Sequence, residues 1–316
     1  MPITDPRRFG FPKAELHVHL EGSAEPRTVC DLNPAVTLEE VTRRYQYSDF
    51  AGFIEAYKWV VTMLDRPSHY VLLTERLLAS MAAQGVEYAE INLSVGVMMW
   101  RGLDVAAIFD AISETALGSS VKTRWIFDAV RQFGAEAAEG VAREAAARAS
   151  LDVVGFGIGG DESKIAAREF RRAFDIARDA GLHSLPHAGE TTDARSVWDA
   201  IRELGAERIG HGIRAADDPA LLAYLRDHRI PLEISISSNV ATGAVASLAE
   251  HPVRRIFDAG VPIVLNSDDP AMFHTSINRE YEIAAESFGF TGAELAALAA
   301  ESFKWAADNL SARAGA

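Results

Sequence analysis

Short apolar runs alternate along the chain with longer segments rich in alanine and leucine. The runs are rich in β-branched residues and end in polar or glycine residues, as strands do, whereas the longer segments have the periodicity of amphipathic helices. This alternation indicates an α/β protein, and about eight strands are predicted, the number that a (β/α)8 TIM barrel requires. The predicted strands are 14–19, 88–94, 123–128, 153–158, 182–187, 208–211, 231–236 and 262–268.

Helical segments fill the intervals between these strands. Gly181, Gly205 and Gly260 stand just past such segments, where a left-handed backbone favours glycine. No linker, low-complexity block or charge run divides the chain, so residues 1–316 are predicted to form one barrel domain with residues 1–10 as an N-terminal arm. Examples of the predicted helices are 136–149, 164–180, 194–204 and 219–229.

The segment 24–85 is too long for a single crossover helix, and several extra helices are predicted there between the first and second strands. Within it, apolar residues recur at helical intervals on one face, and such a face either packs on the barrel wall or covers the mouth as a lid. The residues of this face are Phe50, Phe53, Ile54, Tyr57 and Val61.

The composition narrows the functional class. The 316 residues are 48% hydrophobic and 24% charged, and their formal net charge is −14, which opposes binding to nucleic acid or to an anionic membrane. Cys30 is the only cysteine, which excludes an intrachain disulfide and a thiolate metal cluster. Neither a signal peptide nor a membrane span is predicted, so the cytoplasm is the expected location. The sequence carries no signal for an oligomeric state.

In a parallel barrel, catalytic side chains lie where the strands end. His17 and His19 are two residues apart at the end of the first strand and therefore share one face, while His187 ends the fifth strand and Asp268 the eighth. These ends converge on the barrel axis. Three imidazoles and a carboxylate with one position left open describe a catalytic Zn²⁺ site.

Further polar residues stand at the same strand ends. Glu190 follows His187 in a turn, His211 lies between two glycines, and Asp269 adjoins Asp268. Taken singly, each has a structural interpretation: a helix cap for His187, a core imidazole for His211 and a helix N-cap for Asp269. Taken together with the predicted ligands, these residues indicate an active site.

Other motifs carry less information. The run GFGIGG at 155–160 matches a dinucleotide-binding pattern, but the acidic residues Asp161 and Glu162 follow it and oppose a pyrophosphate. Its glycines suit close approach to a flat ligand instead. His274 is a candidate neighbour of the metal site, whereas structural roles are expected for His69, His183, His228 and His251.

Six motifs together resemble the adenosine deaminase family of the amidohydrolase superfamily, from about residue 13 to about residue 303. They are KAELHVHLEGS, GDE, HAGE, GHGI, SSN and NSDDPAMF, in this order. The resemblance implies one zinc ion held by His17, His19, His187 and Asp268, with Glu190 as the proton carrier at purine N1, His211 beside the attacking water, Asp269 at N7 and the Gly160 backbone at N3.

The implied reaction is hydrolytic deamination of a 6-aminopurine. A zinc-activated water attacks C6, Glu190 protonates N1, and ammonia leaves, with Asp268 as a second acceptor for the water proton. The predicted fourth strand contains no lysine to bridge two metals, so one metal is expected. A catalytically silent zinc- or nucleoside-binding relative would have no need of Glu190 or His211.

The substrate is less closely defined. Glu21 occupies the position where adenosine deaminases usually have an aspartate that meets the ribose 5′ hydroxyl. The family includes enzymes for adenosine, for free adenine and for 6-amino-6-deoxyfutalosine, a menaquinone precursor with a benzoate-containing arm on its ribose. The segments 95–102 and 127–134 most resemble the last group. For that arm, Met98, Met99 and Trp100 are candidates for an apolar wall, and Arg101 or Arg131 for the cation.

Overall fold

The computed structural model describes residues 9–310, so the predicted arm 1–10 lies almost wholly outside the described residues. Its strands are all parallel and lie in two hydrogen-bonded groups, β1 to β5 and β6 to β9. The strands are β1 (Lys13–His19), β2 (Val86–Leu93), β3 (Lys122–Val130), β4 (Val153–Gly159), β5 (His183–Ser184), β6 (His187–Ala188), β7 (Ile209–His211), β8 (Leu232–Ile234) and β9 (Ile263–Leu265).

The two groups of strands join into one barrel. The predicted fifth strand is divided into β5 and β6 at Leu185 and Pro186, because proline has no N–H for a strand ladder. β5 pairs with β4 and β6 pairs with β7, so the divided strand still connects its neighbours. On the other side, the His19 N–H donates to the carbonyl of Asp268 at 2.8 Å and closes the circle. The predicted eight-stranded barrel is therefore confirmed, with the fifth strand in two pieces.

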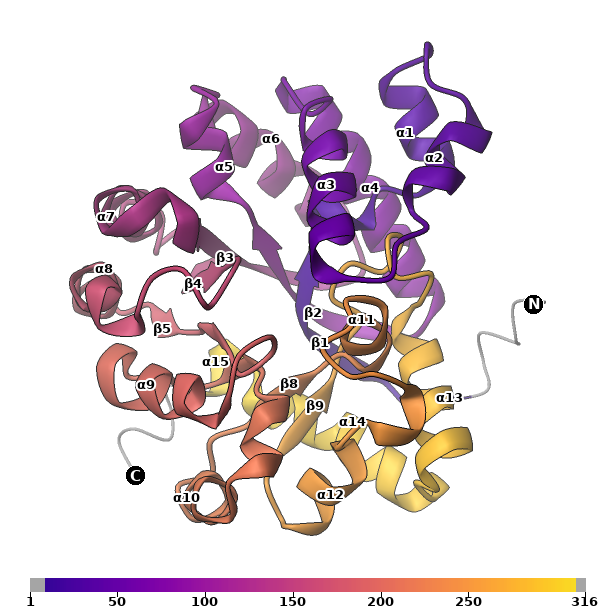
Figure 1. Cartoon of the computed structure of the whole chain (residues 1–316). Helices are drawn as coiled ribbons and strands as arrows, with labels where there is room; N and C mark the ends of the chain where they lie inside the picture. Colours follow the sequence, from indigo (N-terminus) through magenta and orange to yellow (C-terminus); the bar gives the residue numbers. More distant parts are fainter. Residues whose placement is uncertain (1–8, 311–316) are drawn as a thin grey trace.

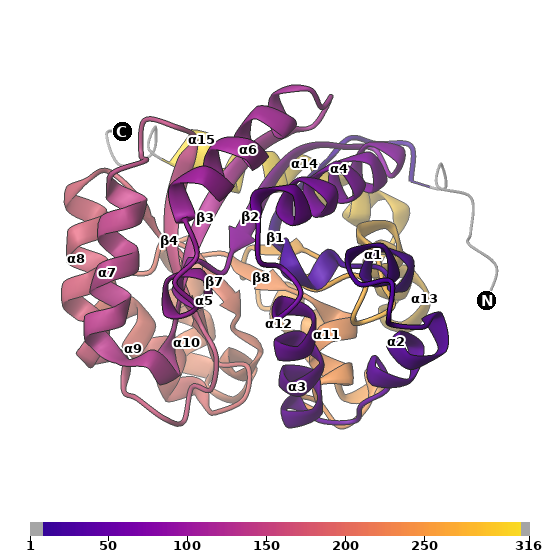
Figure 2. The same cartoon turned by 90° about the horizontal axis from the view of Figure 1, so that it is seen from above.

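Most helices surround the strands on the outside (Figures 1 and 2), whereas α11 lies over the strands in the middle of Figure 1. After the first crossover they are α5 (Val95–Trp100), α6 (Val105–Leu117), α7 (Gly134–Ala146), α8 (Arg171–Asp179), α9 (Ala194–Leu204), α10 (Pro219–Asp227), α11 (Ile236–Ala241), α12 (Val253–Asp258), α13 (Ile277–Phe288), α14 (Gly292–Trp305) and α15 (Ala307–Leu310). Short 3-10 helices occur at Glu21–Ser23, Arg131–Phe133, Ala167–Phe170, Ile213–Asp217 and Leu248–Glu250. None of the helices in residues 9–310 is long and apolar enough to cross a bilayer.

Most boundaries agree with the pattern of the sequence, and two differences are informative. The predicted helix 164–180 begins only with a 3-10 turn at Ala167–Phe170, before α8. The predicted eighth strand is regular only as far as Leu265. Beyond it the Asn266 N–H still donates to the carbonyl of Ile234 at 2.9 Å, and the backbone then turns at Asp268 in the left-handed region, with a φ of 63°. The same turn aims the side chain of Asp268 at the barrel axis.

The inserted segment between β1 and β2 holds four helices, α1 (Pro26–Leu32), α2 (Leu38–Arg44), α3 (Phe50–Val61) and α4 (Pro67–Ala83). The predicted extra helices are therefore present. α4 packs against β2 and α6 as the crossover helix. α3 turns its predicted apolar face, from Phe50 to Val61, toward a cavity at the mouth of the barrel.

Candidate metal centre and active site

Four side chains from three strand ends meet on the barrel axis. His17 and His19 come from β1, His187 from β6 and Asp268 from the turn after β9, and one ligand atom of each lies within 4.8 Å of all the others. Asp268 Oδ1 lies 3.5 Å from His17 Nε2 and 3.3 Å from His19 Nε2, which is 3.3 Å from His187 Nε2. A tetrahedron with metal–nitrogen distances of about 2.0–2.1 Å has edges of roughly 3.3 Å, so this donor set fits a divalent ion such as zinc.

A second layer of contacts holds the first histidine in place. His17 Nδ1 lies 2.9 Å from a carboxylate oxygen of Glu233, and Arg208 Nε donates to the other oxygen of Glu233 at 2.6 Å. Arg208 is wholly buried and also pairs with Glu90. With Nδ1 engaged in this way, Nε2 of His17 is buried and has no hydrogen-bond partner among residues 9–310, as expected of a metal ligand.

Two site residues are held in an uncommon backbone conformation. His211 has a φ of 61° and Asp268 a φ of 63°, a region that costs non-glycine residues about 1–3 kcal/mol. Gly210 precedes His211, and a Cβ at that glycine would stand 2.9 Å from the His17 ring and 3.2 Å from the His187 ring. Glycine at 210 therefore lets β7 approach the imidazoles closely.

The turn that carries Glu190 is fastened by Glu162. The carboxylate of Glu162 accepts backbone N–H groups from Gly189 at 2.7 Å and from Glu190 at 2.8 Å, and hydroxyl groups from Thr192 and Ser196. Burial favours the neutral form of Glu162, but the hydrogen bonds outweigh it and lower its pKa. The last acidic residue of the GDE motif thus acts as a fixed anion beneath the catalytic turn.

Glu190 and His211 face each other beside the metal ligands. His211 Nε2 lies 3.7 Å from Glu190 Oε2 and 3.9 Å from Asp268 Oδ2. Burial raises the pKa of Glu190 well above its usual range, and the neighbouring Asp268 charge adds to this. Burial lowers the pKa of His211 to about 4. The pair therefore combines a protonated carboxyl group with a neutral imidazole.

Asp269 is buried next to the ligand Asp268. Burial and the charge of Asp268 both raise the pKa of Asp269 well above its usual range, and its Oδ1 has no hydrogen-bond partner among the described residues. A protonated carboxyl group of this kind donates a hydrogen bond to a ring nitrogen of a bound ligand. Gly22 lies against it, and a Cβ there would stand 1.7 Å from Asp269 Oδ1.

We expect Gly22→Ala to displace the Asp269 carboxyl group and to lower kcat/KM at least about tenfold, which corresponds to one lost hydrogen bond of roughly 1.4 kcal/mol. Steady-state kinetics and metal analysis check this result, because the metal ligands are not touched. Gly292→Ala is the matched control, since a Cβ at Gly292 meets nothing within 4 Å. Unchanged kinetics in Gly22→Ala would remove Asp269 from the site.

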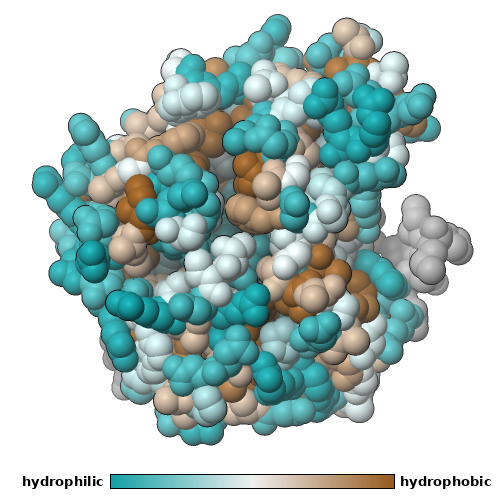
Figure 3. Space-filling model, viewed as in Figure 1, coloured by the Kyte–Doolittle hydropathy of each residue, from teal (hydrophilic) through white to brown (hydrophobic). Residues whose placement is uncertain are grey.

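A cavity of about 650 Å³ opens from these residues to the surface. His19, His187, Glu190, His211, Asp268 and Asp269 lie at its floor, and Gly160 lies on its wall. Apolar residues of α3 and of the segments after β2 and β3 form its outer part, and the space-filling view is hollowed at this place with apolar residues around it (Figure 3). Gln132 also lines the cavity, directly beside Gly160, where a Cβ would stand 2.2 Å from its amide oxygen.

Glu21, a candidate for contact with the substrate, is not among the residues that line this cavity in the structure. Glu21 is wholly buried, and its carboxylate accepts the backbone N–H of Ser94 at 3.1 Å. Tyr57 of α3 covers it, with its hydroxyl group 3.4 Å from Glu21 and 2.7 Å from Ser94 Oγ. Tyr57 and Ser94, which line the cavity, stand where Glu21 was expected.

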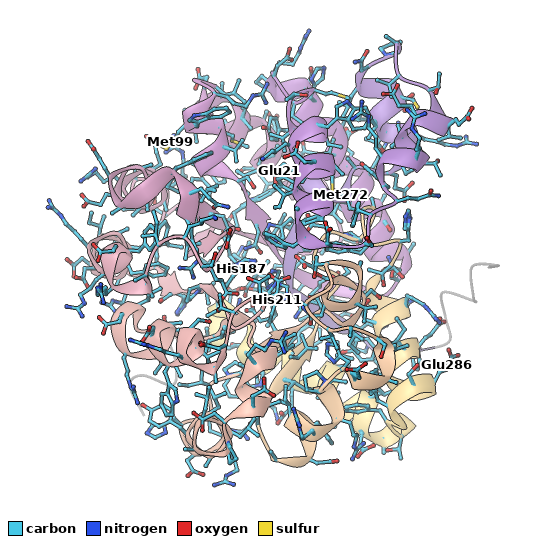
Figure 4. All side chains as sticks on the ribbon, in the orientation of Figure 1. Glu21, Met99, His187, His211, Met272 and Glu286 are labelled. Atoms are coloured by element: carbon cyan, nitrogen blue, oxygen red, sulfur yellow. The ribbon has the colours of Figure 1, made fainter. Side chains whose placement is uncertain are left out.

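Of the three candidates for the apolar wall of the cavity, only Trp100 lines it. Trp100 lines the cavity and stacks on Phe133 with ring centroids 5.6 Å apart, whereas Met98 is buried in the core and Met99 does not line the cavity. Figure 4 shows Met99 well away from His187 and His211, which lie together.

Of the two candidate cations, Arg101 lines the cavity and Arg131 does not. The guanidinium of Arg131 is buried, and it donates to the carbonyl of His187 at 2.7 Å. Arg131 is therefore part of the support of β6.

The structure also places two of the other histidines, His274 and His251. His274 is exposed, its Nε2 lies 3.2 Å from the carbonyl of Tyr45, and it is not among the residues that line the cavity. His251 is buried and contacts the side chain of Asn239, which contacts His211. The sequence pattern predicted no role for Asn239. Only its place in the SSN motif could have drawn attention to it.

The comparisons with known proteins show the family of this chain. The adenosine deaminase family model matches residues 12–314. An aminodeoxyfutalosine deaminase of Streptomyces coelicolor is 44% identical over 92% of this chain and 78% of its own, and an adenine deaminase of Rhizobium johnstonii is 40% identical over 90% of this chain and 91% of its own. The crystal structure of an adenine deaminase from Arthrobacter aurescens superposes with a TM-score of 0.88 at 27% identity, over 96% of this chain and 99% of the other. The chain belongs to the adenosine deaminase family.

Proposed function

We propose that this protein is a zinc-dependent enzyme that hydrolytically deaminates a 6-aminopurine nucleoside, and that 6-amino-6-deoxyfutalosine is its preferred substrate. The observation that carries the reaction is the placement of a protonated Glu190 and a neutral His211, 3.7 Å apart, beside three histidines and an aspartate. A site that only stored zinc has no use for this pair. The 44% identical relative from Streptomyces coelicolor supports the choice of substrate.

The residues divide the chemistry as follows. His17, His19, His187 and Asp268 would hold the metal, which when bound would supply a water molecule that ionises near neutral pH. Glu190 delivers its proton to N1 of the purine, so that no negative charge builds up on the ring when C6 is attacked. Protonated Asp269 donates to N7 and fixes the orientation of the base. The water oxygen forms its bond to C6 while Asp268 accepts one water proton. The amino group takes up that proton, the C6–N bond breaks and ammonia leaves, and the second water proton returns Glu190 to its protonated form.

The outer cavity is larger than a purine ring requires and suits a nucleoside with a long substituent. α3 covers it, and we propose that the insertion 24–85 serves as this cover. Arg101 lies at the rim, where its guanidinium donates to the carbonyls of Leu64 at 2.7 Å and Thr62 at 3.2 Å, and to that of Val61. Within residues 9–310 these three bonds leave two of its five N–H groups for a carboxylate. Lys58 of α3 also lines the cavity.

The test is the ratio of kcat/KM for 6-amino-6-deoxyfutalosine to that for adenosine, measured by the change in purine absorbance. We expect at least about tenfold preference, roughly 1.4 kcal/mol, for the substrate with the carboxylate. Arg101→Ala should abolish this preference and leave adenosine turnover nearly unchanged, because the purine contacts are intact. Arg66→Ala removes an exposed arginine that does not line the cavity and is the matched control.

Free adenine is the alternative substrate, in line with the 40% identical adenine deaminase of Rhizobium johnstonii. The same assay includes it. A preference for adenine or adenosine would overturn the substrate assignment and retain the deaminase, whereas no turnover of any of the three would favour a catalytically silent zinc- or nucleoside-binding protein.

A further inference from the structure

Three buried side chains form a line from the site into the wall behind it. Nδ1 of His211 lies 3.1 Å from the amide nitrogen of Asn239 in α11, and the amide oxygen of Asn239 lies 3.1 Å from Nε2 of His251, which precedes α12. The three residues are 2%, 0% and 4% exposed. The other ring nitrogen of His211, Nε2, faces Glu190 and Asp268 in the site. The hydrogen bonds from Asn239 and His251 therefore reach the ring of His211 through Nδ1, and its Nε2 faces the site.

The direction of these hydrogen bonds is determined at their far end. The backbone N–H of Val253 lies 3.2 Å from His251 Nδ1. A backbone N–H can only donate, so Nδ1 of His251 accepts and carries no proton. Burial lowers the pKa of His251 to about 3, so the ring is neutral and its single proton is on Nε2. His251 therefore donates to the oxygen of Asn239.

The orientation of the Asn239 amide group fixes which ring nitrogen of His211 accepts a hydrogen bond. Because its oxygen accepts from His251, its NH2 group is the part that faces His211 Nδ1. Asparagine NH2 can only donate, so Nδ1 of His211 accepts and carries no proton. Neutral His211 then has its proton on Nε2, on the side of Glu190 and Asp268.

We propose that Asn239 and His251 are positioning residues that hold His211 as the tautomer protonated at Nε2. In this form His211 donates a hydrogen bond to the oxygen that attacks C6 and does not act as the base that removes its proton. The role of that oxygen rests on the proposed function, whereas the tautomer follows from the hydrogen bonds alone. The two are therefore tested by separate measurements.

Asn239→Asp is the sharpest variant, because it keeps the size of the side chain and replaces the donating NH2 with an oxygen that accepts. His211 then has to donate from Nδ1. Long-range ¹H–¹⁵N spectra of the metal-loaded protein with ¹⁵N-labelled histidine report which nitrogen carries the proton, and His211→Gln identifies the signal. We expect Nε2–H in the wild type and a protonated Nδ1 in Asn239→Asp. We also expect kcat to fall at least about 10²-fold, with KM changed less than about threefold and about one metal per chain retained.

A pair of variants at His251 separates positioning from a structural role. His251→Gln keeps a donor near the position of Nε2 and gives up the acceptor for Val253, whereas His251→Asn keeps that acceptor and does not reach Asn239. If His251 positions His211, Gln retains kcat within about threefold and Asn loses at least about tenfold. If His251 only supports the start of α12, the order is reversed.

The inference is overturned by a wild-type His211 protonated at Nδ1, by an unchanged tautomer and kcat in Asn239→Asp, or by the reversed order at His251. A wild-type protein that turns over no aminopurine, but whose His211 is protonated at Nε2, would confirm the tautomer and contradict the proposed function. Thermal unfolding of each variant identifies any that fail to fold, and the remaining variants then decide.

Discussion

Glu190→Gln is expected to lower kcat at least about 10²-fold while the metal stays bound. Glutamine has the shape of a protonated glutamate and fits the same buried place, but its amide does not deliver a proton to N1 of the purine. Burial raises the pKa of Glu190 well above its usual range, so the native carboxyl group holds the proton that the variant lacks. Steady-state kinetics with metal analysis measure both parts of this expectation.

Thr242→Ser provides a matched control for Glu190→Gln. Thr242 Oγ1 lies 3.5 Å from Glu190 Oε1, and serine retains the hydroxyl group there. We expect kcat of this variant to stay within about threefold of the wild type. If Glu190→Gln turned over at a near-normal rate, the proton at N1 would have to come from another group.

His17→Ala is expected to abolish both metal binding and deamination. Only three of the four ligands would remain, and the buried carboxylate of Glu233 would lose the imidazole that lies 2.9 Å from it, so both the donor set and its support would be disrupted. Elemental analysis of the purified protein should give about one divalent metal per chain for the wild type and almost none for the variant.

His228→Ala is the matched control for His17→Ala, because His228 is an exposed histidine whose Nδ1 contacts the carbonyl of Tyr224 in α10. It should retain both the metal and the activity. Stoichiometric metal in His17→Ala would mean that the four side chains do not form one site.

Much of the fold and the site could be predicted because local rules decide them. The period of two on a strand puts His17 and His19 on one face, and the strand ends of a barrel converge, so His187 and Asp268 fall beside them. The position of Glu190 followed from the same rule. The division of the fifth strand at Pro186 was also open to a local argument, because proline lacks the N–H of a ladder.

The contacts that the sequence did not predict all join segments that are far apart in the chain. Tyr57 of the insertion covers Glu21, and neither residue indicates the other by its local pattern. Arg101 follows α5 and Arg131 follows β3, but the first reaches the carbonyls at and just past the end of α3 while the second is buried and donates to the carbonyl of His187 in β6. Whether a side chain faces a cavity or the core is decided by its tertiary neighbours.

His251 was assigned a structural role for the same reason. It stands just before Pro252, away from any predicted strand end, and its link to His211 through Asn239 spans residues 211 to 251. A local sequence pattern does not predict hydrogen bonds between segments so far apart. It becomes visible only when β7, α11 and the segment before α12 are placed side by side.

The central claim is that the metal site and the deaminase site are one. The most direct measurement is a titration of the metal-free protein with zinc, in which ammonia release from 6-amino-6-deoxyfutalosine, adenosine and adenine is followed. The account predicts no ammonia without metal and a rise that ends at about one zinc per chain. Ammonia release by the metal-free protein, or a fully loaded protein that releases none from any of the three, would contradict it.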